Sequence, residues 1–487
     1  MTCTSIIKLF ISAVLCVLFS CSNNKAFGKN SIAEANVFTD YTEAEYVIDK
    51  TIDLKGKTMQ IPECGRVIFT DKGRIINGTV LISPRTYEIE GGWGVFNNVR
   101  ILPSISLSNS VKCALPKVNA RWFCLGANDS VDNTKSLQQA LDAAHNLFIP
   151  LYLPRGYYKI IQSLELKDGD VIIGGDSGII DINNQRGATF IRYSGNGPSM
   201  INVTGKYVTL QNILLSASTP FQSDGITLHG DAGLYFNLEN VLICNAKYGV
   251  TGILSKNNGL SECIWYKVKI WNCVRGISID INSESGQYMT YNTFRNVFIS
   301  NMKEKGIFLH CRAINSCSFR DCLIETVGYA GACDDKYIGS GIYAMDIVNE
   351  GVQGSIIVDG GYFENTYFSK TNGEIVKSFN YSNNAVFSLK NISLSLMNTR
   401  FANTRTIVKS NGQDIINIIN CIDNGYLGPE VTDISVCKTN PKTVIEVNGY
   451  TFANKNKEIV GPFSKSLSPN NNISIKNIRK KEGALVI

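Results

Sequence analysis

The sequence predicts an all-β protein folded as a parallel β-helix, a solenoid of stacked coils. Two observations carry this prediction: an internal repeat, and a composition suited to short strands and tight turns. The 487 residues include 42 Gly and only 12 Pro, with abundant Asn, Ile, Val, Phe and Tyr. These residues favour strands joined by turns in the left-handed backbone conformation. At 44% hydrophobic residues, the chain has enough apolar material for a large core, which excludes a disordered protein.

The repeat is a column of polar or Gly residues, each set between apolar ones as in Leu238-Glu-Asn-Val-Leu-Ile. Its members are spaced by 28, 27, 29, 25, 39, 38 and 22 residues. Such a period is typical of β-helix coils, each of which needs its neighbours to bury its inner face. The two longest steps indicate inserted loops, and we expect the Asn side chains to face inward as a ladder of amide hydrogen bonds. The members are Asn212, Asn240, Lys267, Asn296, Asp321, Gly360, Asn398 and Asn420.

A second element follows each turn, where Gly opens a strand of alternating pattern. Gly276-Ile-Ser-Ile-Asp and Gly306-Ile-Phe-Leu-His are two examples, and alternation with period two predicts strands.

One helix is predicted, over Thr134 to His145, because Leu137 and Leu141 recur at helical spacing within it. Asp132-Asn133-Thr134 supply its N-terminal cap.

Residues 118–175 resemble the opening of the pectate lyase superfamily, the rhamnogalacturonase/epimerase-like right-handed β-helices. The matching segments are Gly126-Ala-Asn-Asp-Ser-Val-Asp-Asn-Thr134, the predicted helix, Leu151-Tyr-Leu-Pro-Arg-Gly-Tyr-Tyr-Lys159 and Val171-Ile-Ile-Gly-Gly175. The resemblance implies a right-handed β-helix whose N-terminal end is capped by the helix. It also implies work on carbohydrates, as lyase, hydrolase, epimerase or tailspike-like binder. Asn128-Asp129-Ser130 replaces the Gly-Asp-Gly of the family, from which we expect a changed loop.

The resemblance and the repeats divide the chain into five parts. Residues 1–21 form a signal peptide, 22–44 a linker, 45–115 a small β module, 116–430 the β-helix and 431–487 C-terminal strands and a cap. The signal reads Lys8, a short apolar segment, then Leu18-Phe19-Ser20-Cys21, which is similar to the lipobox of bacterial lipoproteins. We therefore expect an exported protein, lipid-anchored to the cell envelope through Cys21. A plain secretory signal cleaved after Gly28 is the alternative.

Candidate catalytic residues come from strand alternation, because no catalytic motif of a known family transfers as a set. Alternation points Asp280 outward, and the next coil does the same for His310 and Arg312. His229 and Asp231 fall in the same columns two coils earlier. Adjacent coils lie ~4.8 Å apart, so Asp280 should sit beside His310.

This set suits chemistry on an acidic polysaccharide. An Asp–His pair with an Arg fits β-elimination on a uronate, since the Asp orients the imidazole as base and the Arg neutralises the carboxylate. Asp231 and Asp280 instead fit hydrolysis, in which two carboxylates act together. Polar residues are also what any solvated β-helix face carries, so a non-catalytic glycan-binding module and a uronate epimerase remain alternatives.

The sequence shows no cofactor motif and leaves Ca²⁺ binding and the oligomeric state open. It contains 15 Cys, but they lack metal-ligand spacing and lie mostly in apolar stretches, as buried thiols do. The only basic cluster, Arg479-Lys480-Lys481, is too short to indicate a nucleic-acid partner.

Overall fold

The computed structural model describes residues 44–107, 111–175, 188–254, 259–280, 288–327, 342–351 and, with gaps, parts of 353–480. The predicted signal peptide, with Cys21, lies outside these residues, as does nearly all of the linker. Within the described residues, no helix has the length and apolar character that crossing a membrane requires.

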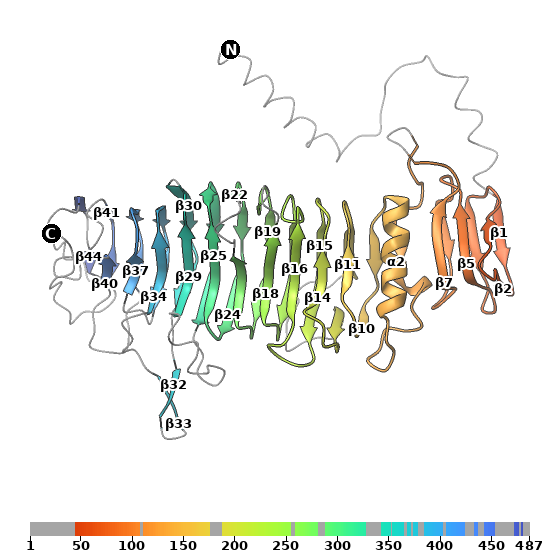
Figure 1. Cartoon of the computed structure of the whole chain (residues 1–487), viewed down its shortest axis with the longest axis horizontal. Coiled ribbons are helices and arrows are strands. Elements are labelled where there is room, and N and C mark those ends of the chain that lie inside the picture. Colours follow the sequence, from red (N-terminus) through yellow and green to blue (C-terminus); the bar gives the residue numbers. More distant parts are fainter. Residues whose placement is uncertain are drawn as a thin grey trace, which may run out of the picture.

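The described chain is a stack of parallel coils along one axis, which confirms the predicted parallel β-helix (Figure 1). One strand of each coil enters a sheet that we call the ten-stranded sheet. Its strands in the described chain are β11 (Leu164–Leu166), β14 (Ser199–Val203), β16 (Asp224–Gly230), β18 (Tyr248–Leu254), β21 (Arg275–Asp280), β25 (Lys305–Cys311), β29 (Ile342–Asn349), β34 (Asn384–Lys390), β37 (Thr406–Ser410) and β40 (Asp433–Val436).

The rest of each coil contributes to a second sheet, here called the long sheet. Its 23 strands in the described residues are β8 (Val118–Asn119), β9 (Leu151–Leu153), β10 (Gly156–Ile160), β12 (Val171–Gly174), β13 (Thr189–Tyr193), β15 (Thr209–Ala217), β17 (Asn237–Cys244), β19 (Ile264–Tyr266), β20 (Lys269–Trp271), β23 (Thr293–Arg295), β24 (Phe298–Met302), β27 (Cys317–Arg320), β28 (Leu323–Val327), β30 (Gly354–Asp359), β31 (Tyr362–Glu364), β35 (Ile392–Met397), β36 (Arg400–Ala402), β38 (Ile415–Ile419), β39 (Ile422–Asp423), β41 (Val444–Asn448), β42 (Thr451–Phe452), β43 (Asn472–Lys476) and β44 (Arg479–Lys480).

Further strands precede or flank this stack. Before it, β1 (Glu45–Ile48), β4 (Arg66–Phe69) and β6 (Glu88–Glu90) form one parallel sheet, and β2 (Thr51–Asp53), β5 (Arg74–Ile82), β3 (Thr58–Gln60) and β7 (Phe96–Pro103) form another. Beside it, β22 (Tyr288–Thr290) pairs with β26 (Ala313–Asn315), and β32 (Phe368–Thr371) pairs antiparallel with β33 (Glu374–Lys377).

The helix α2 (Thr134–Leu147) lies between the first strands and the main stack (Figure 1). It starts at the predicted residue because the Asp132 carboxylate accepts a hydrogen bond from the Thr134 backbone N–H at 3.0 Å. Leu137 and Leu141 are buried, as the helical spacing predicts. Strands flank α2 on both sides, and its polar face, with Gln139, Asp142 and Asn146, lies opposite β7.

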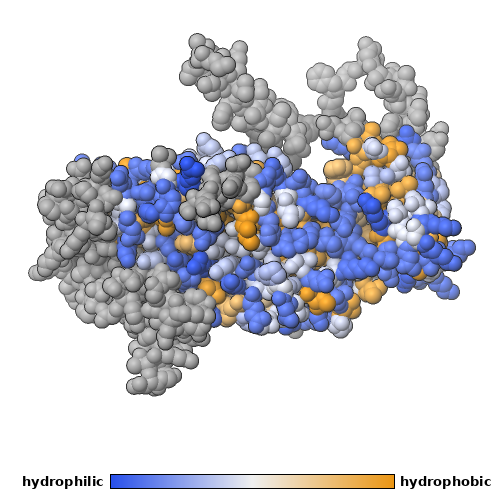
Figure 2. All heavy atoms as spheres, in the orientation of Figure 1, coloured by the Kyte–Doolittle hydropathy of each residue, from blue (hydrophilic) through white to orange (hydrophobic). Residues whose placement is uncertain are grey.

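The core runs through the middle of the stack, where apolar residues of successive coils are register partners. On the ten-stranded sheet, Ile226, Val250, Ile277, Ile307 and Met345 form one such column, and all are buried. The ten cysteines in the described chain are free thiols, nine of them buried. The exterior is mostly hydrophilic with scattered apolar residues (Figure 2).

The repeat column is a column of left-handed turns, but its side chains do not face inward as predicted. All eight residues have φ between 51° and 72°. Asn240 Nδ2 donates to Asn212 Oδ1 at 2.7 Å, so one step of the ladder exists. Lys267 interrupts it, both of these Asn are only half-buried, and Asn296 is exposed. The reason is that each of these residues has a left-handed backbone, which bends the chain and breaks the inward–outward alternation of the strand.

Candidate active site

The predicted outer column lies on the ten-stranded sheet, centred on Asp280 at the end of β21 and His310 in β25. These two residues are register partners on adjacent coils. Their inward neighbours Ile279 and Leu309 are fully buried, so alternation forces both polar side chains outward. Along the sheet the column reads His229, Ile253, Asp280, His310, Val348 and Lys390.

His310 is held between two carboxylates. Its Nδ1 lies 3.0 Å from Asp280 Oδ1, and its Nε2 lies 3.2 Å from Glu350 Oε1. Lys390 Nζ lies 2.6 Å from the other oxygen of Glu350. The His310 side chain is 26% exposed and Asp280 60% exposed, so solvent and a ligand reach the group. Lys390 and His310 hold the pKa of the Glu350 carboxyl below its usual range.

Sequence reasoning missed Glu350, the residue that completes this group. Glu350 directly follows β29, and its backbone N–H donates to the Cys311 carbonyl at 2.9 Å. That bond ties it to the coil of His310. Between His310 and Glu350 the chain passes through one of the two long inserts, so the repeat alone did not place Glu350 beside His310.

One predicted member of the site, Asp231, lies elsewhere than alternation suggested, whereas Arg312 and His229 are placed as expected. Asp231 follows the end of β16 at Gly230, whose φ is 59°, and it pairs with Lys206 Nζ at 3.1 Å. The left-handed Gly breaks the alternation, so Asp231 does not continue the column. Arg312 follows β25 and is exposed. His229 does lie in the column, with Nε2 3.2 Å from Asn202 Oδ1, and Ile253 separates it from Asp280.

A second charged group borders the same face at the start of these strands. Arg275 Nε lies 2.7 Å from Glu304 Oε2, and Lys305 Nζ lies 2.6 Å from Asp346 Oδ2. Both cations also lie 4.5 Å from the ring centre of Phe308. Each of these two cations therefore already has a carboxylate partner, and the group contributes no free charge to the face.

The long sheet carries another carboxylate pair that sequence reasoning missed. The register Leu323 with Tyr362 and Ile324 with Phe363 continues to Glu325 beside Glu364. Tyr362 donates its hydroxyl to Glu364 Oε2 at 2.8 Å. Burial, and then the charge of Glu364, raise the pKa of Glu325. The signal in the sequence was the outward position of each Glu in its strand, but the 39-residue step between their coils hid the register.

The described residues contain no group of three or more His, Cys, Asp or Glu arranged to hold a metal ion. The groups that the ten-stranded sheet brings together at His310 are two carboxylates, an imidazole and the Lys390 ammonium.

Comparison with known proteins places the chain by fold. No family model matches it, and no curated protein matches it. Among solved structures it is similar to the gp42 tailspike of Acinetobacter phage vb_AbaP_AS12, at 12% identity and a TM-score of 0.50, over 78% of this chain and 65% of that one.

Two further solved structures are similar at lower scores. The tailspike of Acinetobacter phage vB_ApiP_P1 matches at 14% identity and a TM-score of 0.44, over 69% of this chain and 59% of that one. The catalytic unit of the GH87 alpha-1,3-glucanase from Streptomyces thermodiastaticus matches at 11% identity and a TM-score of 0.44, over 78% and 70%. The chain thus spans about six tenths of the length of the tailspikes. It is a parallel β-helix protein, and at these identities the likeness shows the fold alone.

Proposed function

We propose that this protein is an exported carbohydrate-active enzyme that cleaves an acidic polysaccharide on the outer face of the ten-stranded sheet. The observation that carries the proposal is His310 held between Asp280 and Glu350. A titratable group bonded to two carboxylates on an exposed face is suited to proton transfer, and fits cleavage better than passive binding.

Hydrolysis fits this geometry better than β-elimination. The carboxylates of Asp280 and Glu350 contact both ring nitrogens of His310, so neither nitrogen is free to take a proton from the sugar as the base of an elimination. The lowered pKa of Glu350 keeps it ionised. Asp280 and Glu350, both beside His310, supply the two carboxyl groups that most glycoside hydrolases use.

Arg312 supports an acidic substrate. It is exposed one residue beyond β25, and in the described part of the chain it has neither a hydrogen bond nor an ion pair. Arg275, Lys305 and Lys390, by contrast, each have a carboxylate partner. An unpaired guanidinium near His310 could bind a sugar carboxylate through two parallel hydrogen bonds, the bidentate geometry of Arg–carboxylate pairs.

We also assign the chain to the pectate lyase superfamily, and infer export as a lipoprotein through Cys21. The residues at 118–175 and the lipobox-like Leu18-Phe19-Ser20-Cys21 support these assignments.

The second candidate function is a non-catalytic, tailspike-like glycan-binding module, which the similarity to a phage tailspike favours. A uronate epimerase would use the same face without cleaving the chain.

The test is a panel of polysaccharides assayed for reducing ends and for the ultraviolet absorbance of unsaturated products. Hydrolysis produces reducing ends without absorbance, and elimination produces both. Binding without either product supports the binding module.

His310→Ala should abolish activity without lowering the melting temperature, because its outward side chain supports little of the core. Glu325→Gln, which alters the carboxylate pair of the long sheet, is the matched comparison. Loss of activity in Glu325→Gln with full activity in His310→Ala would move the site to the long sheet and refute the assignment.

A further inference from the structure

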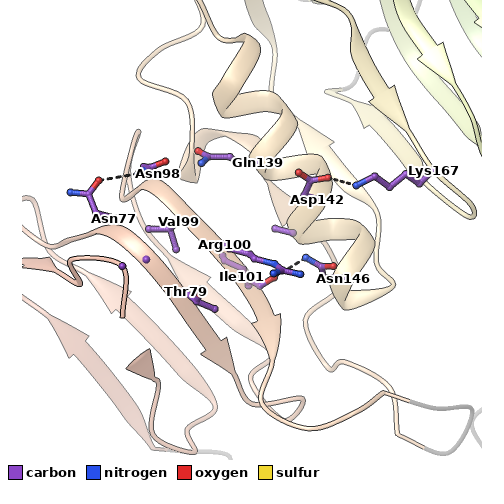
Figure 3. Close-up of a pocket in the computed structure, with 13 residues that line it drawn as sticks. Asn77, Thr79, Asn98, Val99, Arg100, Ile101, Gln139, Asp142, Asn146 and Lys167 are labelled. Atoms are coloured by element: carbon purple, nitrogen blue, oxygen red, sulfur yellow. Dashed lines mark hydrogen bonds and ion pairs between the residues drawn. The ribbon is translucent and has the colours of Figure 1, made fainter. Parts of the chain in front are cut away.

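A cavity of about 600 Å³ opens between the first strands and the polar face of α2 (Figure 3). Strands β5 and β7 form one wall and α2 the other. Small residues, including Gly78, Thr79 and Ala143, leave the space open. Its volume lies within the ~300–1,000 Å³ typical of ligand pockets, which often form between two packed units. The helix α2 that lines it lies several coils away from β25, the strand that contains His310 (Figure 1).

The cavity is lined by planar polar side chains whose orientations are set by hydrogen bonds. Asn98 Nδ2 donates to Asn77 Oδ1 at 3.1 Å, and Asn146 Nδ2 donates to the Ile101 carbonyl at 3.1 Å. The amides thus hold fixed positions around the space, and Figure 3 shows them on opposite walls. Fixed amides and hydroxyls recognise sugar hydroxyls at a small entropic cost, because little side-chain freedom is lost on binding.

Three charged residues line the cavity, and Arg100 is the one without a charged partner in the described chain. Lys167 Nζ lies 2.7 Å from Asp142 Oδ1, so these two charges balance. Arg100, on β7, has no ion pair or hydrogen bond of its side chain among the described residues, and Figure 3 shows it directed toward α2 beside Asn146. An unpaired guanidinium offers two parallel N–H donors, the geometry that matches a carboxylate.

We propose that this cavity is a second saccharide-binding site, which takes a uronate unit with its carboxylate on Arg100 and its hydroxyls on the surrounding amides. It rests on the proposed function only in taking the ligand to be a sugar acid. The site holds the polysaccharide at one end of the β-helix, away from the residues that would cleave it. The strands before α2 thereby gain a role that the cleavage site does not require.

The experiment measures binding by isothermal titration calorimetry at low salt, in the His310→Ala background so that no probe is cleaved. The probes are uronic-acid trisaccharides, their methyl esters, a sulfated trisaccharide and inorganic phosphate. Arg100→Gln removes the cavity charge. Lys72→Gln, at an exposed residue in the turn between β4 and β5 and outside the cavity, removes an equal charge as the control.

We expect a uronate to bind, Arg100→Gln to weaken its affinity at least tenfold, and Lys72→Gln to leave it unchanged. The methyl ester should bind as weakly as the acid binds to Arg100→Gln. The proposal is overturned if the wild type and Arg100→Gln bind the uronate with equal affinity, or if acid and methyl ester bind equally well. It is also overturned if no uronate binds, or if only phosphate or the sulfated trisaccharide binds. Loss of cleavage in other variants leaves these results unaffected, so this proposal and the proposed function fail separately.

Discussion

Asp224, the first residue of β16, has a carboxylate whose charged form is destabilised by burial. Its Oδ1 is buried without a hydrogen-bond partner in the described chain. Burial raises the pKa of Asp224 to about 6, against the opposing effects of Lys247 and the backbone N–H of Tyr248. The folded protein therefore binds this proton more tightly than the unfolded chain does. Above pH 6 the carboxyl is charged in both states, and the folded state carries the cost of burying that charge.

Asp224→Asn should therefore stabilise the protein at pH 7 by at most about 3 kcal/mol, at 1.36 kcal/mol for each unit of pKa shift. The benefit should shrink as the pH falls from about 6 toward about 4, because the wild-type carboxyl is then protonated in the folded protein and no buried charge remains. Urea unfolding of both proteins at pH 4 and pH 7 measures this. A difference that is the same at both values would mean that Asp224 titrates normally in the folded protein.

Among the elements, the turns between strands repeat one backbone conformation from coil to coil. The column from Asn212 to Asn420 has left-handed φ at every member, with Asn, Asp, Gly or Lys at these positions. Asn and Gly adopt this conformation at lower cost than other residues do. The backbone preference therefore applies at every coil, whereas the side-chain ladder is present only where two Asn are adjacent, as at Asn212 and Asn240.

This distinction predicts different losses at two positions. Asn240→Ala should destabilise the protein by about 2 kcal/mol. The substitution removes the side-chain hydrogen bond to Asn212 and also the preference of Asn for the left-handed backbone conformation. Asn296→Ala at an exposed corner should cost about 1 kcal/mol, and Asn296→Gly about zero, since Gly accepts φ 54°. Chemical denaturation gives the values. Equal losses for the two Ala variants would show that the bond to Asn212 adds no stability.

On the scale of the whole molecule, the thiols serve as packing groups. Nine of the ten cysteines in the described chain are buried and none forms a disulfide. Burial raises the pKa of these thiols, for example that of Cys244 to about 11 and that of Cys263 to about 12. A thiol that stays protonated and inside the stack is a poor nucleophile.

These nine thiols should therefore resist alkylation in the folded protein and react fully in denaturant. Iodoacetamide labelling, followed by mass spectrometry of the peptides, locates each one. Cys113, which is only half-buried, is the internal comparison and should label first. Rapid labelling of Cys263 or Cys311 under native conditions would show that the coils open, or that the core is not packed as described.

The coil, the turn column and the Asp280–His310 contact could all be predicted from the amino-acid sequence alone. Each of these depends on a local rule: apolar residues every second position, left-handed turns at Asn and Gly, and adjacent coils in register. Such rules act within about one coil, where the chain length between equivalent positions is nearly constant. Alternation failed at Asp231 because a left-handed Gly at the strand end turned the chain away from the column.

The three-dimensional fold, and not the repeat, shows which groups meet across the irregular steps. Glu350 reaches His310, and Glu364 reaches Glu325, after steps of 39 residues or more, where inserted loops remove any fixed period. The position of α2 between two sets of strands, which creates the cavity at Arg100, is likewise visible only in the folded structure. The physical reason is the same in each case: loop length does not determine where a chain returns, and the register is chosen by the burial of apolar residues in the coil that it joins.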